Sequence, residues 1–83
     1  MALQEDFQAA MARSKGLPNQ PPAVLLELYG LFKQASTGDV SGKRPGMMDI
    51  RGRAKYDAWA SRSGMSADDA MTLYIDRVAE LGG

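Results

Sequence analysis

Apolar residues recur at helical spacing in four segments of the chain, and no segment has the alternating β-branched pattern of a strand. The pattern therefore predicts an all-α protein. In the first segment the shared helical face carries Leu3, Phe7, Ala10, Met11 and Ser14. Gly16, followed by Leu17 and Pro18, is a strong stop signal for this helix.

The second helix is predicted to start around Pro21–Pro22, since proline is tolerated in a first turn, and to run to about Ser36. A projection at about 100° per residue places a broad apolar arc on one side. Its members are Val24, Leu25, Leu28, Leu31, Phe32 and Ala35, with Glu27, Gly30 and Gln34 opposite and Leu26, Tyr29 and Lys33 on one flank. Tyr29 and Lys33, one turn apart at the border of the arc, form a candidate binding site.

Residues 37–48 contain turn formers and show no hydrophobic period. This connection is long for a helical bundle, where roughly 2–8 residues join antiparallel neighbours. We therefore expect a crossover loop that lets the second and third helices run parallel.

The third helix is predicted over about residues 50–62, capped by Asp49 and ending at Gly64. Its wheel places three cations around small and aromatic surface: Arg51, Lys55 and Arg62 beside Ala58 and Trp59. The fourth helix starts at Ser66, which forms a capping-box-like motif with Asp69, and extends to Gly82. Its inward stripe comprises Ala70, Met71, Tyr74, Ile75, Val78 and Leu81.

The length of 83 residues suits one domain, residues 1–83. With 45% hydrophobic and 24% charged residues, the chain is globular in composition. Its apolar runs are too short to cross a bilayer, so it is not expected to be membrane-embedded. The acidic start, Glu5 and Asp6, shows no secretory signal, and the cytoplasm is the expected location.

The chain has neither cysteine nor histidine. These absences exclude disulfides, a thiolate nucleophile and the usual metal sites, so no metal and no cofactor are expected. Asp68 and Asp69 lie in a predicted first turn, where carboxylates stabilise the helix N-terminus. We therefore expect no enzyme activity.

The formal net charge is zero, but cations are in excess between Lys33 and Arg62. A basic middle in a neutral protein indicates a local anion site and no nucleic-acid track. Tyr29 and Lys33 could join the cations of the third helix in a phosphate pocket. On spacing alone, a charged stripe facing water is the commoner explanation. Met47, Met48 and Met65 are weak indications of surface that adapts to an aliphatic ligand.

Several motifs together resemble the acyl-CoA-binding protein family. They are Tyr29 to Ala35, Gly38-Asp-Val40, Lys43 to Met47, Asp49, Gly52 to Trp59, and Asp69-Ala-Met71 with Tyr74-Ile75. They recur in family order and spacing, and the resemblance covers essentially the whole chain.

The resemblance implies an up-down-down-up four-helix bundle with a long crossover loop between helices 2 and 3. It also implies a non-catalytic carrier of medium- to long-chain acyl-CoA esters for transport and pool buffering. Such a carrier is expected to be a cytoplasmic monomer that makes transient contacts with acyl-CoA-using enzymes.

The resemblance also implies a role for each matching residue. Tyr29, Lys33 and Lys55 would bind the ribose 3′-phosphate, and Phe32, where relatives often have Tyr, would stack on adenine. Arg51 would contact the CoA head, and Lys15 matches a basic contact residue. Tyr74, Leu25 and Leu26 would lie near the acyl chain. The alternative is a protein-interaction module on the same scaffold, whose basic third helix docks an acidic partner.

Overall fold

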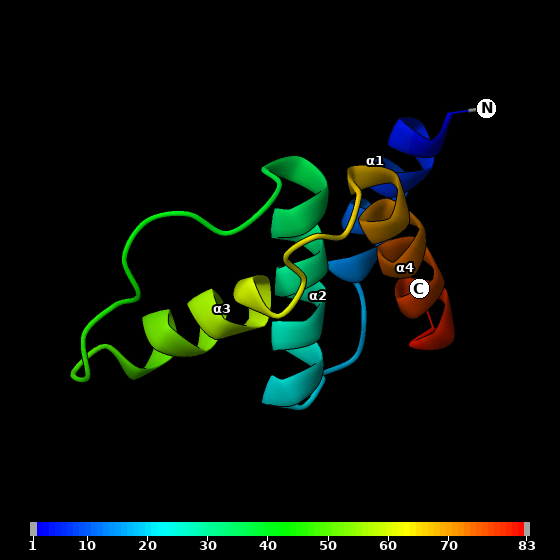
Figure 1. The fold of residues 1–83 in the computed structure, drawn as a ribbon. Helices are drawn as coiled ribbons and strands as arrows, with labels where there is room; N and C mark the ends of the chain where they lie inside the picture. The colour runs from blue at the N-terminus through cyan, green and yellow to red at the C-terminus, as the bar shows by residue number, and fades with distance from the viewer. Residues whose placement is uncertain (1, 83) are drawn as a thin grey trace.

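The computed structural model describes residues 2–82, and its four helices confirm the all-α fold. The helices are α1 (Leu3–Ser14), α2 (Pro22–Ser36), α3 (Ile50–Ala60) and α4 (Ala67–Glu80) (Figure 1). No strand occurs within the described residues. None of the helices described there is long and apolar enough to span a membrane.

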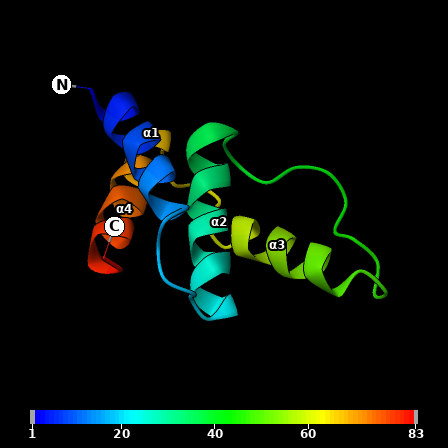
Figure 2. The same ribbon diagram turned by 180° about the vertical axis from the view of Figure 1, so that it is seen from behind.

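The helices pack around α2 and α4. In the ribbon, α1 and α4 run in the same direction and α2 runs in the opposite one (Figures 1 and 2). α4 packs against both α1 and α2, while α3 crosses α2 and, within residues 2–82, packs on no other helix. α3 therefore extends from the bundle as an arm whose position depends on its contact with α2.

The hydrophobic core lies between α1, α2 and α4. Its buried members are Phe7 and Ala10 of α1, Leu28, Leu31 and Ala35 of α2, and Ala70, Met71, Tyr74 and Val78 of α4. The rings of Phe7 and Tyr74 pack edge to face with their centroids 5.2 Å apart, a geometry that aromatic pairs favour. α3 contributes no fully buried side chain.

The predicted start of each of the two later helices is present. The Asp49 carboxylate accepts a hydrogen bond from the Gly52 N–H at 2.9 Å, and the Ser66 hydroxyl accepts one from the Asp69 N–H at 3.0 Å. The predicted end of α3 is wrong by two residues, because the helix stops at Ala60 and residues 61–64 form turns. Arg62 therefore leaves the predicted row of cations and lines a separate hollow together with Glu27 and Arg77.

The face of α2 opposite the apolar arc is not a solvent face. Gly30 is buried under α3, and Gln34 is only 1% exposed. The Gln34 Nε2 atom donates hydrogen bonds to Asp39 Oδ1 and to the Met65 carbonyl, both at 2.8 Å. Asp39 also accepts from the Gly64 N–H, and these two donors lower the pKa of its carboxyl group. One polar cluster thus ties α2 to both loops that flank α3.

The crossover loop, residues 37–49, is fastened along α3. The Trp59 indole N–H donates to the Gly38 carbonyl at 2.6 Å, and the Tyr56 hydroxyl donates to the Gly42 carbonyl at 3.0 Å. Arg44 makes two hydrogen bonds to Asp57, at 2.6 and 2.8 Å, which lower the pKa of that carboxyl group. These hydrogen bonds hold the crossover loop alongside α3.

Candidate functional site

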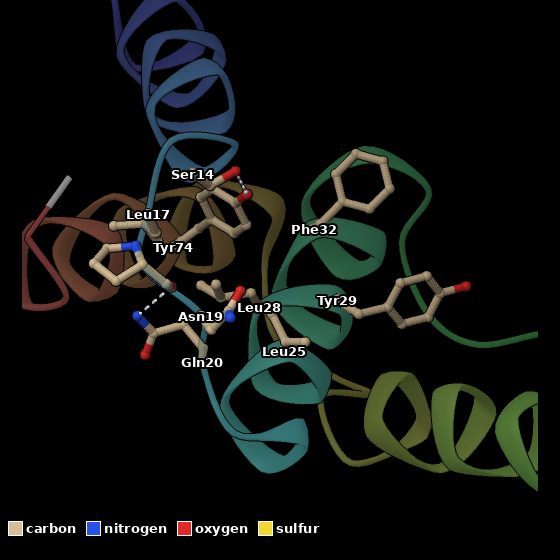
Figure 3. Close-up of a pocket in the computed structure, with 10 residues that line it drawn as sticks. Ser14, Leu17, Asn19, Gln20, Leu25, Leu28, Tyr29, Phe32 and Tyr74 are labelled. Carbon is tan, nitrogen blue, oxygen red and sulfur yellow. Dashed lines mark hydrogen bonds between the residues drawn. The ribbon is translucent and has the colours of Figure 1, made fainter.

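The N-terminal half of α2 lies between two hollows. The larger, which we call the α1–α2 hollow, has a volume of about 420 Å³ and is bounded by α1, residues 17–20, α2 and α4 (Figure 3). Its lining residues are Ser14, Leu17, Pro18, Asn19, Gln20, Leu25, Leu28, Tyr29, Phe32 and Tyr74. Five of the ten are apolar aliphatic or aromatic side chains of α2 and α4, so an apolar group can lie against them.

The polar groups of this hollow are held by local hydrogen bonds. The Tyr74 hydroxyl donates to the Ser14 hydroxyl at 3.2 Å (Figure 3). Ser14 in turn donates to the Met11 carbonyl at 2.6 Å. In the connecting segment, the Gln20 side-chain amide donates to the Pro18 carbonyl at 2.9 Å. The Tyr74 hydroxyl is thus already satisfied, and Tyr74 lines the hollow from the buried core.

The second hollow, the α2–α3 hollow, has a volume of about 260 Å³ and an almost wholly apolar wall. It is lined by Pro22, Leu25, Leu26, Ile50, Arg51, Ala54 and Lys55. Arg51 and Lys55 contribute the aliphatic parts of their side chains, as long cationic residues do where their charged ends reach water. Leu25 is 54% exposed and lines both hollows, which therefore adjoin at its side chain.

Two lysines lie over aromatic rings at the junction of α2 and α3. The Lys55 Nζ atom is 5.6 Å from the centroid of the Tyr29 ring, and the Lys33 Nζ atom is 4.7 Å from the centroid of the Trp59 ring. Each contact joins one helix to the other. Cation–π contacts of this kind stabilise a preferred position of the ammonium group.

The cations of this region are not neutralised by neighbouring carboxylates. Within residues 2–82, ion pairs form at Arg44 and Arg77 and at no other basic side chain. Lys33, Arg51 and Lys55 consequently present a basic edge to which an anionic group can bind without displacing a carboxylate.

The structure brings together most of the residues predicted from the sequence. Leu25, Tyr29, Phe32 and Tyr74 line the α1–α2 hollow, while Leu25, Leu26, Arg51 and Lys55 line the α2–α3 hollow. Lys33 lies on the α2–α3 junction over Trp59. Lys15 lines neither hollow. It is exposed at the C-terminal end of α1, one residue after Ser14.

The sequence reasoning missed several lining residues. Ile50 and Ala54 complete the apolar wall of the α2–α3 hollow, and they precede Lys55 by five residues and one residue. Ser14 was predicted only as part of a packing stripe, and Leu17 only as part of a helix stop signal, yet both line the α1–α2 hollow. The four-residue spacing of Ile50 and Ala54, next to that of Arg51 and Lys55, is the signal that could have identified this wall.

The site offers no metal centre. Among the residues the structure describes, no three carboxylates are grouped closely enough to hold a metal ion, and the sequence has no histidine or cysteine.

Comparison with known proteins gives a consistent result. The sequence model of the family described as "Acyl CoA binding protein" matches residues 4–78. An acyl-CoA-binding protein homolog of Manduca sexta is 47% identical over 83 residues, covering 98% of this chain and 92% of its own. An acyl-CoA-binding protein of Ricinus communis is 46% identical, covering 100% and 93%.

Solved structures agree at the level of the fold. The crystal structure of Oryza sativa Acyl-CoA-Binding Protein 2 superposes with a TM-score of 0.93 at 41% identity, covering 95% of this chain and 87% of that one. The crystal structure of ACBP from Moniliophthora perniciosa superposes with a TM-score of 0.88 at 36% identity, covering 98% and 80%.

Proposed function

The chain belongs to the acyl-CoA-binding protein family, and from this premise we propose that it is a non-catalytic carrier of medium- to long-chain acyl-CoA esters, serving their transport and the buffering of their pool. The observation that carries the proposal is the junction at Leu25, where an aromatic-lined hollow meets an apolar one beside unpaired cations. An acyl-CoA ester has the matching parts, because it joins a phosphorylated nucleotide to an aliphatic chain.

The cations at the α2–α3 junction are proposed to hold the head of the ligand. Lys33 and Lys55, with the Tyr29 hydroxyl, would bind the ribose 3′-phosphate, and Arg51 would contact the CoA head. Hydrogen bonds from charged donors to phosphate oxygens are about twice as strong as neutral ones. Support comes from the two cation–π contacts, which hold both ammonium groups near Tyr29 and Trp59 at the junction of the two helices.

Phe32 is proposed to stack on the adenine ring. Its side chain is half-buried and lines the α1–α2 hollow one turn from Leu28 and Tyr29, so part of the ring is open to a ligand. Lys15 is proposed to reach the head from the same side, because it directly follows Ser14 of that hollow.

The acyl chain is proposed to run past Tyr74 and Leu25 towards Leu26 and Ile50. Removing the chain from water at these apolar walls stabilises the complex by about 0.8 kcal/mol per methylene group. This is an upper value, because association and ordering of the chain oppose it. Affinity is therefore expected to rise with chain length until the wall is filled.

The remaining parts of the proposal concern the working state of the protein. We propose a monomer in the cytoplasm that passes its ligand to acyl-CoA-using enzymes through transient contacts. The names of the two relatives support the class of ligand, an acyl-CoA ester.

Calorimetric titration with a series of acyl-CoA esters from short to long tests the proposal. We expect the dissociation constant to fall with each added pair of carbons up to the long-chain esters. A dissociation constant that does not depend on chain length would contradict an acyl-chain site in these hollows.

A further inference from the structure

The tip of the crossover loop exposes a cluster of large apolar side chains. Met47 is 82% exposed, Met48 is 97% exposed and Ile50 is 77% exposed. The other large apolar side chains exposed within residues 2–82 are Leu25 at 54% and Leu73 at 42%. Three such residues within four positions make this the most exposed apolar surface that the structure describes.

The fold presents this tip away from the bundle. The tip lies at the far end of the α3 arm, on the side opposite α1 and α4 (Figures 1 and 2). A turn in which the Asp49 N–H donates to the Gly46 carbonyl at 3.0 Å shapes it, and the Arg44–Asp57 ion pair holds its approach against α3. Met47 and Met48 are therefore displayed at a projecting turn and cover no part of the core.

The charge around the tip is positive although the whole chain is neutral. Residues 43–57 contain Lys43, Arg44, Arg51, Arg53 and Lys55 against Asp49 and Asp57, an excess of three positive charges. Exposed apolar side chains among cations are the combination by which peripheral proteins bind anionic membranes, since the apolar groups enter the interface and the cations attract the lipid headgroups.

From these observations we propose that the loop tip is a docking surface for an anionic lipid membrane, with Met47 and Met48 entering the headgroup boundary. A projecting turn fits this partner better than a protein, because a stable protein interface usually buries about 1,200–2,000 Å² of complementary surface. A bilayer surface is soft and accepts a narrow protrusion.

Docking in this way has a consequence that rests on the proposed function. Ile50 belongs to the exposed tip and also lines the α2–α3 hollow together with Leu26. The membrane-facing surface is therefore continuous with the proposed acyl-chain wall. An acyl-CoA ester could pass between bilayer and protein with little of its chain in water.

Co-sedimentation with lipid vesicles, in the absence of acyl-CoA, tests the docking surface. We expect the unsubstituted chain to bind vesicles of phosphatidylcholine mixed with phosphatidylserine, and to bind phosphatidylcholine vesicles much more weakly. The double variant Met47→Ser/Met48→Ser should lose about tenfold in vesicle affinity, because two apolar side chains no longer enter the lipid. The control Leu73→Ser removes an exposed apolar side chain of α4 from the distant hollow that Glu27 and Asp76 line, and should bind like the unsubstituted chain.

Equal vesicle binding by the double variant and the unsubstituted chain would overturn the proposal. A lack of binding to the mixed vesicles would also overturn the proposal, and a protein would then be the partner of the tip. The same double variant should bind palmitoyl-CoA in solution with unchanged affinity and unfold at an unchanged temperature. That titration separates the two ideas, since failure of the carrier function would abolish ester binding in every variant and leave vesicle binding unaffected.

Discussion

Gly30 of α2 lies directly against the backbone of Ala58 of α3, so closely that a methyl group at Gly30 would overlap the Ala58 carbonyl group. The obstacle is main chain, which cannot rotate aside as a side chain can. Because α3 packs on no helix other than α2 within residues 2–82, this close approach fixes how near the arm lies to the bundle. The arm carries Arg51 and Lys55, so the glycine also positions half of the proposed site.

Gly30→Ala is expected to lower the free energy of unfolding by about 1–3 kcal/mol, the usual cost of an overpacked contact. It should also weaken ester binding by moving α3 away from Tyr29. Chemical denaturation and calorimetry measure the two effects. Gly46→Ala is the matched control, because a methyl group there meets no atom within 4 Å. A Gly30→Ala protein as stable as the control would show that α2 and α3 are not packed this closely.

Lys55→Ala is expected to weaken binding of palmitoyl-CoA by about 1.5–3 kcal/mol, the range for a hydrogen bond to a charged group, or roughly 10- to 150-fold. Folding should be largely unaffected, because Lys55 is exposed. The control Lys43→Ala removes the same charge outside both hollows and should change affinity little. Equal affinity of the two variants would remove Lys55 from the site.

Tyr74→Phe removes the hydroxyl of this residue and keeps its ring, so the effects of the two groups can be measured apart. The variant loses the hydrogen bond to Ser14, and we expect a loss in stability of about 0.5–1.5 kcal/mol. Ester affinity should stay within about twofold, since the proposed contact with the acyl chain uses the ring. A large loss of affinity at unchanged stability would mean that the hydroxyl itself binds the ligand.

Asp39→Asn is expected to destabilise the protein at neutral pH and much less in acid. The pKa of Asp39 is lowered in the folded state by hydrogen bonds from Gly64 and Gln34. A carboxylate with a depressed folded-state pKa stabilises the fold above its unfolded pKa, and this stabilisation is lost as the pH falls through the folded pKa. Melting temperatures of both proteins at neutral pH and at about pH 3 measure the change. A difference that does not shrink in acid would contradict the proposed role of the charge.

The apolar spacing was sufficient to predict the three helices that build the core. The proline pair and the stripe to Ser36 located α2, and the Gly16 to Pro18 stop preceded it as expected. α3 was located by its Asp49 cap, but its end was not, because no buried stripe marks its length. Arg62 was consequently placed on the wrong surface.

Residues whose environment depends on another helix could not be predicted from one helical wheel. Gly30 and Gln34 belong to the polar side of the α2 wheel, yet α3 and the loops around it bury them. Leu25 belongs to the apolar arc, yet it is half exposed and lines two hollows instead of the core. Spacing alone left Tyr29, Lys33 and Lys55 as candidates, and their roles came from the family resemblance. The contacts of Lys55 with Tyr29 and of Lys33 with Trp59 across two helices required the tertiary structure.

The most direct test of the account compares palmitoyl-CoA, free palmitate and free CoA as ligands of the unsubstituted protein in one calorimetric series. Palmitate lacks the phosphates that Lys33 and Lys55 are proposed to bind, and CoA lacks the chain proposed for the wall at Leu25 and Leu26. We predict that the ester binds far more tightly than either part. Equal affinity for palmitoyl-CoA and free palmitate would contradict the two-part site.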